Sequence, residues 1–306
     1  MEFYYSDHTY DSTEKVLWIK DGVKTISLDM FSRFHDPAYD TLYKEENFKV
    51  IIPNSVERLD YQCFLEMRAS EYQIPDSVKE ISFAVFEDNK FLKSIQWPSS
   101  VKVISDGVFR ACTNLEEVVL PEGLEVIGDC AFQFCEMLSK ISIPTTVKKI
   151  GDNAFYFCRG LQSLSVPVNV EKIERAAFVE CRNLEMVELH EGLLEIDNLA
   201  FAWCENLTTI TIPTTVESLG TEVFKCCKKL KEIYVPKALY DKYGKDYIKY
   251  DTPVEVIPYN EPMVKNAITN SKTGKENTEI VLNSKKEFKS FCGTIRTNLI
   301  ADKRKK

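Results

Sequence analysis

Six cysteines recur along the middle of this chain at a constant step of 23 residues. Thiolates bind metals and take part in redox chemistry, and two thiols whose Cα atoms lie about 4.4–6.8 Å apart can form a disulfide. If successive 23-residue segments stack like neighbouring strands, equivalent cysteines lie about 5 Å apart, so a metal or redox ladder is geometrically conceivable. The six residues are Cys112, Cys135, Cys158, Cys181, Cys204 and Cys227.

A structural role explains the same spacing with fewer demands. Cysteine is a small, usually buried residue whose thiol is a weak hydrogen-bond donor, and it suits a tight turn. Met67 and Asn89 occupy the equivalent position in two earlier segments, which a metal site would not tolerate. The paired Cys-x-x-Cys spacing typical of zinc sites does not occur, and Cys226 and Cys227 are adjacent. We therefore predict structural thiols, with no metal and no cofactor.

No other group of residues indicates catalysis. The histidines His8, His35 and His190 are scattered without a catalytic partner near them in the sequence, and His190 replaces a turn proline and is expected to be exposed. The motifs G-x-S-x-G, G-x-G-x-x-G and the P-loop do not occur, and the acidic residues follow the repeat instead of clustering. We therefore predict no catalytic residues and a protein that is not an enzyme.

The 23-residue step of the cysteines belongs to a repeat that runs through most of the chain and predicts the elements that hold them. The segments IPTTVKKIG (143–151) and IPTTVESLG (212–220) lie 69 residues apart, which is three steps of 23. An apolar residue followed by proline keeps this step from Ile52-Pro53 to Val235-Pro236, except that the first step is 22 and Leu189-His190 fills one position. Two further ladders keep the register: Phe64, Phe86, Phe109, Phe132, Phe155, Phe178, Phe201 and Phe224, and Leu92, Leu115, Leu138, Leu161, Leu184, Leu207 and Leu230.

One repeat can be interpreted as a strand, a turn and a closing segment. The stretch LEEVVLP (115–121) holds apolar anchors and ends at a proline, as expected of a short strand stopped by a residue that donates no ladder hydrogen bond. The stretch EGLEVIGDCAF (122–132) adds two inward residues and a turn at Gly128-Asp129, and the spacing up to Cys135 favours a short helix or helical turn. Because one repeat cannot bury its own apolar face, stacked copies must share a core.

The pattern resembles a known family. Leu-x-x-Ile-x-Ile-Pro, followed by Val-x-x-Ile-Gly and Ala-Phe-x-x-Cys-x-x-Leu, is similar to the BspA-like leucine-rich repeat family, and LSKISIPTTVKKIGDNAFYFCRGL (138–161) carries it. The resemblance covers residues 16–245. It implies a β-rich repeat solenoid, a right-handed leucine-rich-repeat superhelix of eight to nine 23-residue coils with a strand-lined face. Family members are mostly interaction proteins, found on bacterial surfaces and in some protists, and no enzymatic activity comes with the fold.

The expected organisation is one solenoid followed by a tail. Residues 1–261 form the solenoid, with a degenerate first coil and an insertion in 1–52 and a C-terminal cap in 237–261. Residues 262–306 are polar and basic, and we expect a flexible tail. The insertion at 32–50 is either a folded cap or a contact loop, and its aromatic residues are Phe34, Tyr39, Tyr43 and Phe48.

Charge and composition restrict the partners and the compartment. The net charge is −8, but residues 262–306 alone carry +7, so the remaining body carries −15 and is poorly suited to binding nucleic acid. The N-terminus shows no signal peptide, no apolar stretch is long enough to span a membrane, and ten cysteines favour a reducing compartment. We expect a cytoplasmic protein, or alternatively a nuclear one or a cell-surface one exported by an unconventional route. The basic end, Lys303, Arg304, Lys305 and Lys306, is either a targeting or membrane-anchoring signal or a solvated end.

The strand-lined face is the expected binding site of such a solenoid. Its outward side chains vary between repeats whereas the inward anchors do not, and Val119, Met186 and Tyr234 are the expected apolar contacts. We predict a non-enzymatic protein–protein interaction module; the alternative is a cell-surface adhesin that binds host or matrix proteins. The oligomeric state stays open. One column of the face is Gln96, Val119, Ser142, Ser165, Glu188, Thr211 and Tyr234, and the other is Ser94, Glu117, Lys140, Ser163, Met186, Thr209 and Glu232.

Overall fold

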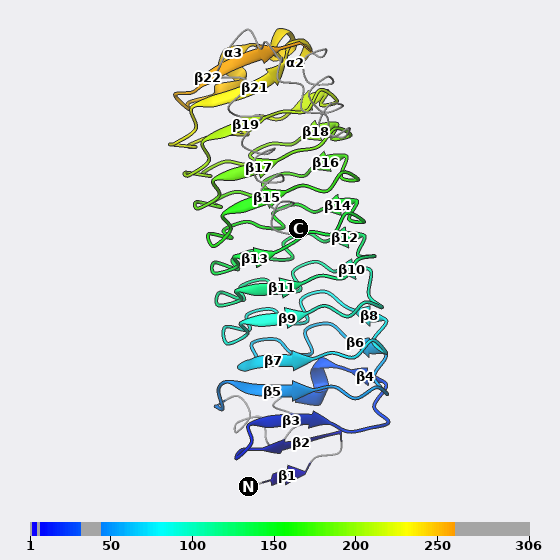
Figure 1. Cartoon of the computed structure of the whole chain (residues 1–306). Coiled ribbons are helices and arrows are strands. Elements are labelled where there is room, and N and C mark those ends of the chain that lie inside the picture. Colours follow the sequence, from blue (N-terminus) through cyan, green and yellow to red (C-terminus); the bar gives the residue numbers. More distant parts are fainter. Residues whose placement is uncertain (1, 5–6, 32–43, 261–306) are drawn as a thin grey trace, which may run out of the picture.

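The computed structural model describes residues 2–4, 7–31 and 44–260 and shows a column of stacked coils (Figure 1). It has about nine turns of about 23 residues. Each regular coil carries two short strands on different sides of the column and a run of turns on a third side. The repeat solenoid predicted from the sequence is confirmed.

One side of the column carries the longer strands of the coils. Neighbouring strands here are parallel and one coil apart, so that Glu117 pairs with Ser94 on one side and with Lys140 on the other. We call the outward surface of this side the strand face. Its strands are β3 (Val16–Ile19), β5 (Phe48–Ile51), β7 (Ala69–Gln73), β9 (Ser94–Gln96), β11 (Glu117–Val119), β13 (Lys140–Ile141), β15 (Ser163–Ser165), β17 (Met186–Glu188), β19 (Thr209–Thr211), β21 (Glu232–Pro236) and β22 (Glu255–Tyr259).

Pairing on this side is interrupted, although every coil carries a strand here. The hydrogen-bonded groups within the described chain are β1-β2-β3-β5-β7, β9-β11-β13, β15-β17 and β19-β21-β22. Because a strand of two or three residues offers only one or two ladder bonds, small differences in tilt between coils are enough to lose them. At each break the hydrogen bonds of the turns still join the two coils, as Phe86 N–H donates to the Val108 carbonyl oxygen between the coils of β7 and β9.

The second side carries the more continuous set of strands, which we call the second ladder. One residue of each strand points into the core, as Ile104, Ile127 and Ile150 do. The even-numbered strands from β10 to β20 form one six-stranded parallel sheet, and β4, β6 and β8 form another. The second ladder consists of β4 (Thr25–Ile26), β6 (Arg58–Leu59), β8 (Glu80–Ile81), β10 (Val103–Ile104), β12 (Val126–Ile127), β14 (Lys149–Ile150), β16 (Lys172–Ile173), β18 (Glu195–Ile196) and β20 (Ser218–Leu219).

The third side, which we call the turn face, corrects the prediction of a short helix in each repeat. In the coil that contains Phe109, two residues adopt a positive φ, Gly107 at 61° and Ala111 at 60°. The N–H groups of Gly107, Phe109 and Ala111 donate to carbonyl oxygens of the next coil, with N···O distances of 2.8–2.9 Å. Helical spacing is therefore present in the sequence, but every second N–H group bonds along the stack instead of along a helix. Turns take the place of the helix because they satisfy these groups between coils.

A glycine follows directly after two strands of the second ladder, β12 and β14, at a point where adjacent coils approach closely. A Cβ atom on Gly128 would lie 2.5 Å from Asp106 Oδ1 and 2.9 Å from the Asp106 nitrogen, and on Gly151 it would lie 2.2 Å from Asp129 Oδ1. A backbone nitrogen cannot move aside without disturbing the coil. The recurring Ile-Gly of the repeat is thus a packing requirement.

The phenylalanine ladder forms one column at the centre of the stack, as predicted. From Phe64 to Phe224, neighbouring rings are stacked with centroids 5.1–6.2 Å apart, and each ring is fully buried. Phe31 extends the column, 5.7 Å from Phe64, and the buried ring of His8 lies 5.1 Å beyond Phe31. His8 therefore caps the N-terminal end of the column of rings, a role that its isolated position in the sequence did not indicate.

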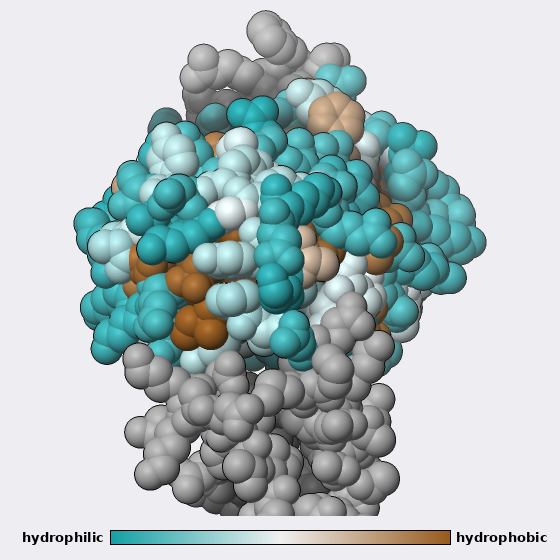
Figure 2. All heavy atoms as spheres, turned by 90° about the horizontal axis from the view of Figure 1, so that it is seen from above, coloured by the Kyte–Doolittle hydropathy of each residue, from teal (hydrophilic) through white to brown (hydrophobic). Residues whose placement is uncertain are grey.

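The two ends of the stack are closed by different elements. At the N-terminal end, β2 pairs antiparallel with β3, and β1 pairs antiparallel with β2. At the C-terminal end two short helices pack on the last coils, where Leu239 and Ile248 are buried in the core, and Thr252 donates a hydrogen bond to the Phe224 carbonyl. Figure 2 looks onto this end and shows a largely hydrophilic surface with a smaller apolar area. The end elements are β1 (Glu2–Tyr4), β2 (His8–Asp11), the 3-10 helix η1 (Leu28–Phe31), α2 (Lys237–Tyr243) and α3 (Lys245–Lys249).

Several sequence predictions fall outside the described residues. They are the basic tail, His35, and the aromatic residues Phe34, Tyr39 and Tyr43 of the insertion. The fourth aromatic residue of the insertion, Phe48, is described and is buried in β5.

Candidate functional site

The cysteine ladder forms a hydrogen-bonded seam between coils. Each thiol donates to the backbone carbonyl oxygen of the column phenylalanine in the coil before, with Sγ···O distances of 3.0–3.3 Å. All nine cysteines of the described chain are free. Burial raises the pKa of each ladder thiol, that of Cys227 to about 12. The ladder residues are therefore protonated at neutral pH, whereas metal binding and nucleophilic attack require the thiolate.

Other hydrogen-bond donors occupy the same position at the ends of the ladder. Asn89 Nδ2 donates to the Phe64 carbonyl oxygen at 2.6 Å, and Thr252 Oγ1 donates to the Phe224 carbonyl oxygen at 2.6 Å. The property shared by thiol, amide and hydroxyl is the ability to donate to a buried carbonyl group. This geometry supports the interpretation of the cysteines as structural. Among the described residues, no group of three or more His, Cys, Asp and Glu side chains is placed to hold a metal ion.

The strand face places most of the predicted binding residues at the surface. Val119 and Met186 are its exposed apolar residues, with 51% and 47% of their surface accessible. They are surrounded by short polar and charged side chains, and Lys140 Nζ lies 3.4 Å from Glu117 Oε2 on the adjacent strand. Of the other predicted residues, Gln96, Ser142 and Ser165 are exposed, and Glu188 and Thr211 are half-buried.

Tyr234 does not take the predicted place. Only 4% of its surface is accessible, so it is buried and cannot act as an exposed anchor. Its hydroxyl group donates to Glu232 Oε2 at 3.1 Å, and Glu232 lies two residues earlier on the same side of β21. The ring therefore lies along the sheet instead of projecting from it. Alternation along a strand predicts the side to which a residue points, but not how far its side chain folds back.

A polar cluster on the strand face was missed by the sequence analysis. Ser165 Oγ lies 3.2 Å from His190 Nε2 and 3.2 Å from Glu188 Oε2. Serine, histidine and glutamate are the residue types of a hydrolase triad, but here the carboxylate contacts the serine and not the second ring nitrogen, so it does not orient the imidazole. The cluster offers hydrogen-bonding groups to a partner. The 23-residue step from Ser165 to Glu188 was the signal that could have revealed it.

The turn face carries aromatic side chains that the sequence analysis also missed. Phe134 lies 5.6 Å from Tyr156 and 5.3 Å from Phe157 between ring centroids, and the guanidinium group of Arg159 lies over Phe157. A sequence signal exists for them, because the two residues between the column phenylalanine and the ladder cysteine vary from coil to coil. They were treated as part of a helix, and their common surface was not recognised.

Farther along the turn face, a lysine lies between two aromatic rings. Lys225 Nζ is 5.5 Å from the centroid of Trp203 and 5.4 Å from that of Tyr250, and it forms an ion pair with Glu222 at 2.8 Å. The carboxylate of Glu222 contributes most to raising the pKa of Lys225, so the ammonium group stays charged. The positive charge of this small site is satisfied within the chain.

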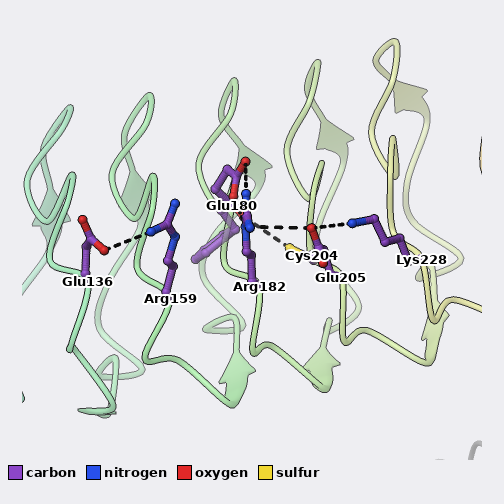
Figure 3. A network of polar contacts seen from close by, with 8 residues as sticks. Glu136, Arg159, Glu180, Arg182, Cys204, Glu205 and Lys228 are labelled. Carbon is purple, nitrogen blue, oxygen red and sulfur yellow. Dashed lines mark hydrogen bonds and ion pairs between the residues drawn. The ribbon is translucent and has the colours of Figure 1, made fainter.

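Charged residues next to the ladder cysteines link neighbouring coils (Figure 3). Arg159 Nη1 lies 3.0 Å from Glu136 Oε2, one coil away. Glu205 Oε1 lies 2.9 Å from Lys228 Nζ and 3.9 Å from Arg182 Nε, so it bridges the coils on both sides. Exposed pairs of this kind contribute little stability each.

A family model supports the resemblance that the repeat pattern suggested. The model of the BspA type leucine rich repeat region matches residues 39–160 and 125–250, with six copies. These matches cover more than half of the chain. The chain belongs to the BspA-type leucine-rich repeat family.

This BspA-type protein is similar to solved structures of bacterial repeat proteins. The T. pallidum leucine rich repeat protein TpLRR is 22% identical, with a TM-score of 0.51 and coverage of 82% of this chain and 96% of that one. A leucine-rich repeat protein from Bacteroides ovatus is also 22% identical, with a TM-score of 0.48 and coverage of 84% and 76%. No curated protein matches the chain. At this level of identity the comparison with TpLRR establishes the solenoid alone.

The helices of this BspA-type repeat protein are short. In the part of the chain that the structure describes, none has the length and apolar character needed to cross a lipid bilayer. Members of leucine-rich repeat families generally act as non-enzymatic scaffolds for protein interaction. The surface of the solenoid is therefore the part to search for function.

Proposed function

We propose that this protein binds another protein through its strand face and acts as a rigid scaffold without catalytic activity. The observation that carries the proposal is the presence of Val119 and Met186 on that face, with about half of each side chain exposed among polar neighbours. Exposed apolar residues surrounded by polar ones are typical of the central contacts of a protein interface.

The construction of the coil supports the same proposal. On the strand-face strands from β9 to β19, each outward residue stands beside an inward residue that packs in or against the core, as Val118 does between Glu117 and Val119. Because the backbone is already ordered, a partner that docks here loses little conformational freedom from this side of the interface. Methionine adapts its shape to different partners, which suits Met186 as a contact residue.

The test is a pair of double variants of the full chain that carry the same kind of change on different surfaces. Val119→Asp with Met186→Asp places two charges on the strand face. Val168→Asp with Leu194→Asp places two charges at positions of similar exposure, 51% and 43%, away from it. The wild type and both variants are used as bait in extracts of the organism that encodes the chain, and each captured protein is purified and titrated against all three.

We expect one captured protein to bind the wild type and the control variant alike and to bind the strand-face variant at least about ten-fold more weakly, a loss of about 1.4 kcal/mol. Equal thermal unfolding of the two variants shows that the loss is not caused by misfolding. Equal binding by both variants would contradict the proposal and would direct attention to the turn face.

A further inference from the structure

A further surface lies at the corner between the second ladder and the turn face. It is formed by the residue two positions after each second-ladder strand from β4 to β14. The first three of these residues are apolar or aromatic, and the next three are aspartates. We call this set the corner column; it consists of Leu28, Tyr61, Phe83, Asp106, Asp129 and Asp152.

Backbone hydrogen bonds fix the spacing of the corner column. The carbonyl oxygens of Phe83, Asp106, Asp129 and Asp152 each accept a hydrogen bond from the coil before, with N···O distances of 2.8–3.5 Å. At the N-terminal end, the pairing of β4 with β6 sets Leu28 beside Tyr61. Successive members therefore lie about 4.8 Å apart, the spacing of adjacent strands, on a rigid support.

The apolar half of the corner column is exposed. Leu28, Tyr61 and Phe83 have 40%, 39% and 51% of their surface accessible, and Val103 on the following strand has 40%. The rings of Tyr61 and Phe83 are stacked, with centroids 4.2 Å apart and an angle of 29° between their planes. Single exposed apolar residues are ordinary, but a contiguous exposed stripe in consecutive coils marks an interaction surface.

The acidic half departs from the charge pattern of the rest of the stack. At other positions opposite charges pair between neighbouring coils, as Glu125 does with Lys102 and Lys148. In the described chain, Asp106 and Asp152 form no ion pair, and Asp129 reaches only Lys149, at 3.9 Å. Like charges stacked directly above one another destabilise a sheet.

The hydrogen bonds of these aspartates do not require their charge. Asp106 Oδ1 and Asp129 Oδ1 each accept from the backbone nitrogen of the next column member, at 2.8 and 3.0 Å. Farther along, Asn198 Oδ1 accepts from the Thr221 nitrogen in the same way, at 2.7 Å. A neutral amide thus performs the same structural role. Burial and the nearby carboxylates raise the pKa of Asp152, as expected of a stack without counter-charges.

We propose that the corner column binds an extended segment of a partner protein that has large apolar residues at one end and lysine or arginine at the other. The apolar half would bury the leucine and aromatic side chains, and the acidic half would receive the cations that the stack itself does not supply. Six members span about 24 Å at the strand spacing, which matches seven or eight extended residues. The acidic half ends at the following coil, where Arg175 stands at the equivalent position.

The test uses dye-labelled ten-residue peptides and fluorescence anisotropy with the full chain. The probe carries leucine and phenylalanine in one half and three lysines in the other, and is made in both orders. A control peptide has the same composition with apolar residues and lysines alternating. The first protein variant carries Asp106→Asn, Asp129→Asn and Asp152→Asn, and the second carries Phe83→Ser. The charge control carries Glu116→Gln, Glu122→Gln and Glu171→Gln, exposed carboxylates outside the corner column.

We expect one order of the probe to bind, and the alternating peptide to bind at least about ten-fold more weakly. Both corner-column variants should lose about ten-fold in affinity for the probe, whereas the charge control should lose less than about two-fold. Absence of binding by both orders of the probe would overturn the proposal. An equal loss of affinity in the charge control would also overturn it, because the effect would then depend on net charge alone. Concentration-dependent self-association that Phe83→Ser abolishes would overturn it in favour of a second copy as the occupant. Carbodiimide cross-links from the three aspartates to lysines of residues 262–306 would overturn it in favour of the chain's own tail.

Discussion

The middle coils and the two ends of the stack satisfy the same core with different residues. In the middle, each column phenylalanine has a ring on both sides and its carbonyl oxygen accepts from a cysteine thiol. At the ends, His8 continues the column of rings, and the amide of Asn89 and the hydroxyl of Thr252 replace the thiol. The position between coils therefore requires a small buried donor, which the thiol supplies in the middle coils.

The largest expected difference between middle and ends is in their response to alkaline pH. A thiol whose pKa is raised in the folded state stabilises the fold below the ordinary thiol value of 9.0, and this stabilisation is lost as the pH rises towards the folded-state value, about 12 for Cys227. Each such thiol costs about 1 kcal/mol between pH 9 and 10, because half of the unfolded-state thiols are already ionised at pH 9, so six thiols together cost about 6 kcal/mol over this pH unit. Denaturant titrations at pH 7.5, 9 and 10 measure the loss.

Lysine and tyrosine also titrate at alkaline pH, so a control variant is needed. Cys158→Ser removes one thiol and keeps a donor at the same position. Above pH 9, its free energy of unfolding should fall less steeply with pH than that of the wild type. The difference in slope should equal the contribution of one titrating thiol. A slope that does not depend on the number of ladder cysteines would show that the thiols are not held protonated by the fold.

Truncation within the phenylalanine column is expected to have the next largest effect. Phe155→Ala removes a ring that stacks on Phe132 and Phe178 and leaves a cavity in the fully buried core, so we expect a loss of about 3–5 kcal/mol in the free energy of unfolding. Phe134→Ala, at a residue with 36% of its surface exposed, is the matched control and should cost far less. Guanidinium titrations followed by circular dichroism compare the two. Equal losses would mean that the column is not the common spine of the coils.

Removing the donor between coils should cost less than removing a ring. Thr252→Val keeps the shape of the side chain and removes the hydroxyl donor to the buried Phe224 carbonyl, which still accepts from the Cys227 N–H, so we expect a cost of about 0.5–1.5 kcal/mol. Cys158→Val makes the corresponding change in the middle. Thr252→Ser keeps the donor and should lie closer to the wild type. If the valine variants are as stable as the serine variants in urea titrations, the hydrogen bond is not the reason for these residues.

The smallest effect is expected at the surface between coils. Glu205→Gln removes the exposed ion pairs with Lys228 and Arg182 and should cost about 0.5 kcal/mol at low salt and less at high salt. Glu185→Gln changes an exposed carboxylate for which no ion pair exists in the described chain, and serves as the control. Thermal unfolding at two ionic strengths separates them. A cost that is independent of salt would show that the effect is not electrostatic.

The regular part of the fold could be predicted from the sequence because its period is a direct consequence of stacking. Phe109, Phe132 and Phe155 must recur at one spacing if each coil presents the same inward surface to the next, and the cysteines recur for the same reason. The helix expected near Cys135 could not be distinguished from turns in this way. Local spacing is compatible with both, and the choice depends on hydrogen bonds to the next coil, which lie far apart in the sequence.

The surface was less predictable than the core. Alternation along the strands placed Val119 and Met186 correctly, but Tyr234 folds onto Glu232 and is buried, because the position of a long side chain depends on its neighbours as well as on its backbone. The contact of Ser165 with His190 and the stacking of Tyr61 on Phe83 follow from the register between coils. The sequence contains that register, but only the three-dimensional arrangement shows which surfaces it brings together.

The most direct test of the functional account is site-specific photo-cross-linking in living cells. Benzoylphenylalanine replaces Val119 on the strand face in one protein and Leu194, the residue before β18 of the second ladder, in another, two residues of comparable exposure. We predict that irradiation joins a partner protein to the chain at position 119 and gives no such product at position 194. The same product at both positions, or a product at position 194 alone, would contradict the assignment of the strand face as the binding surface.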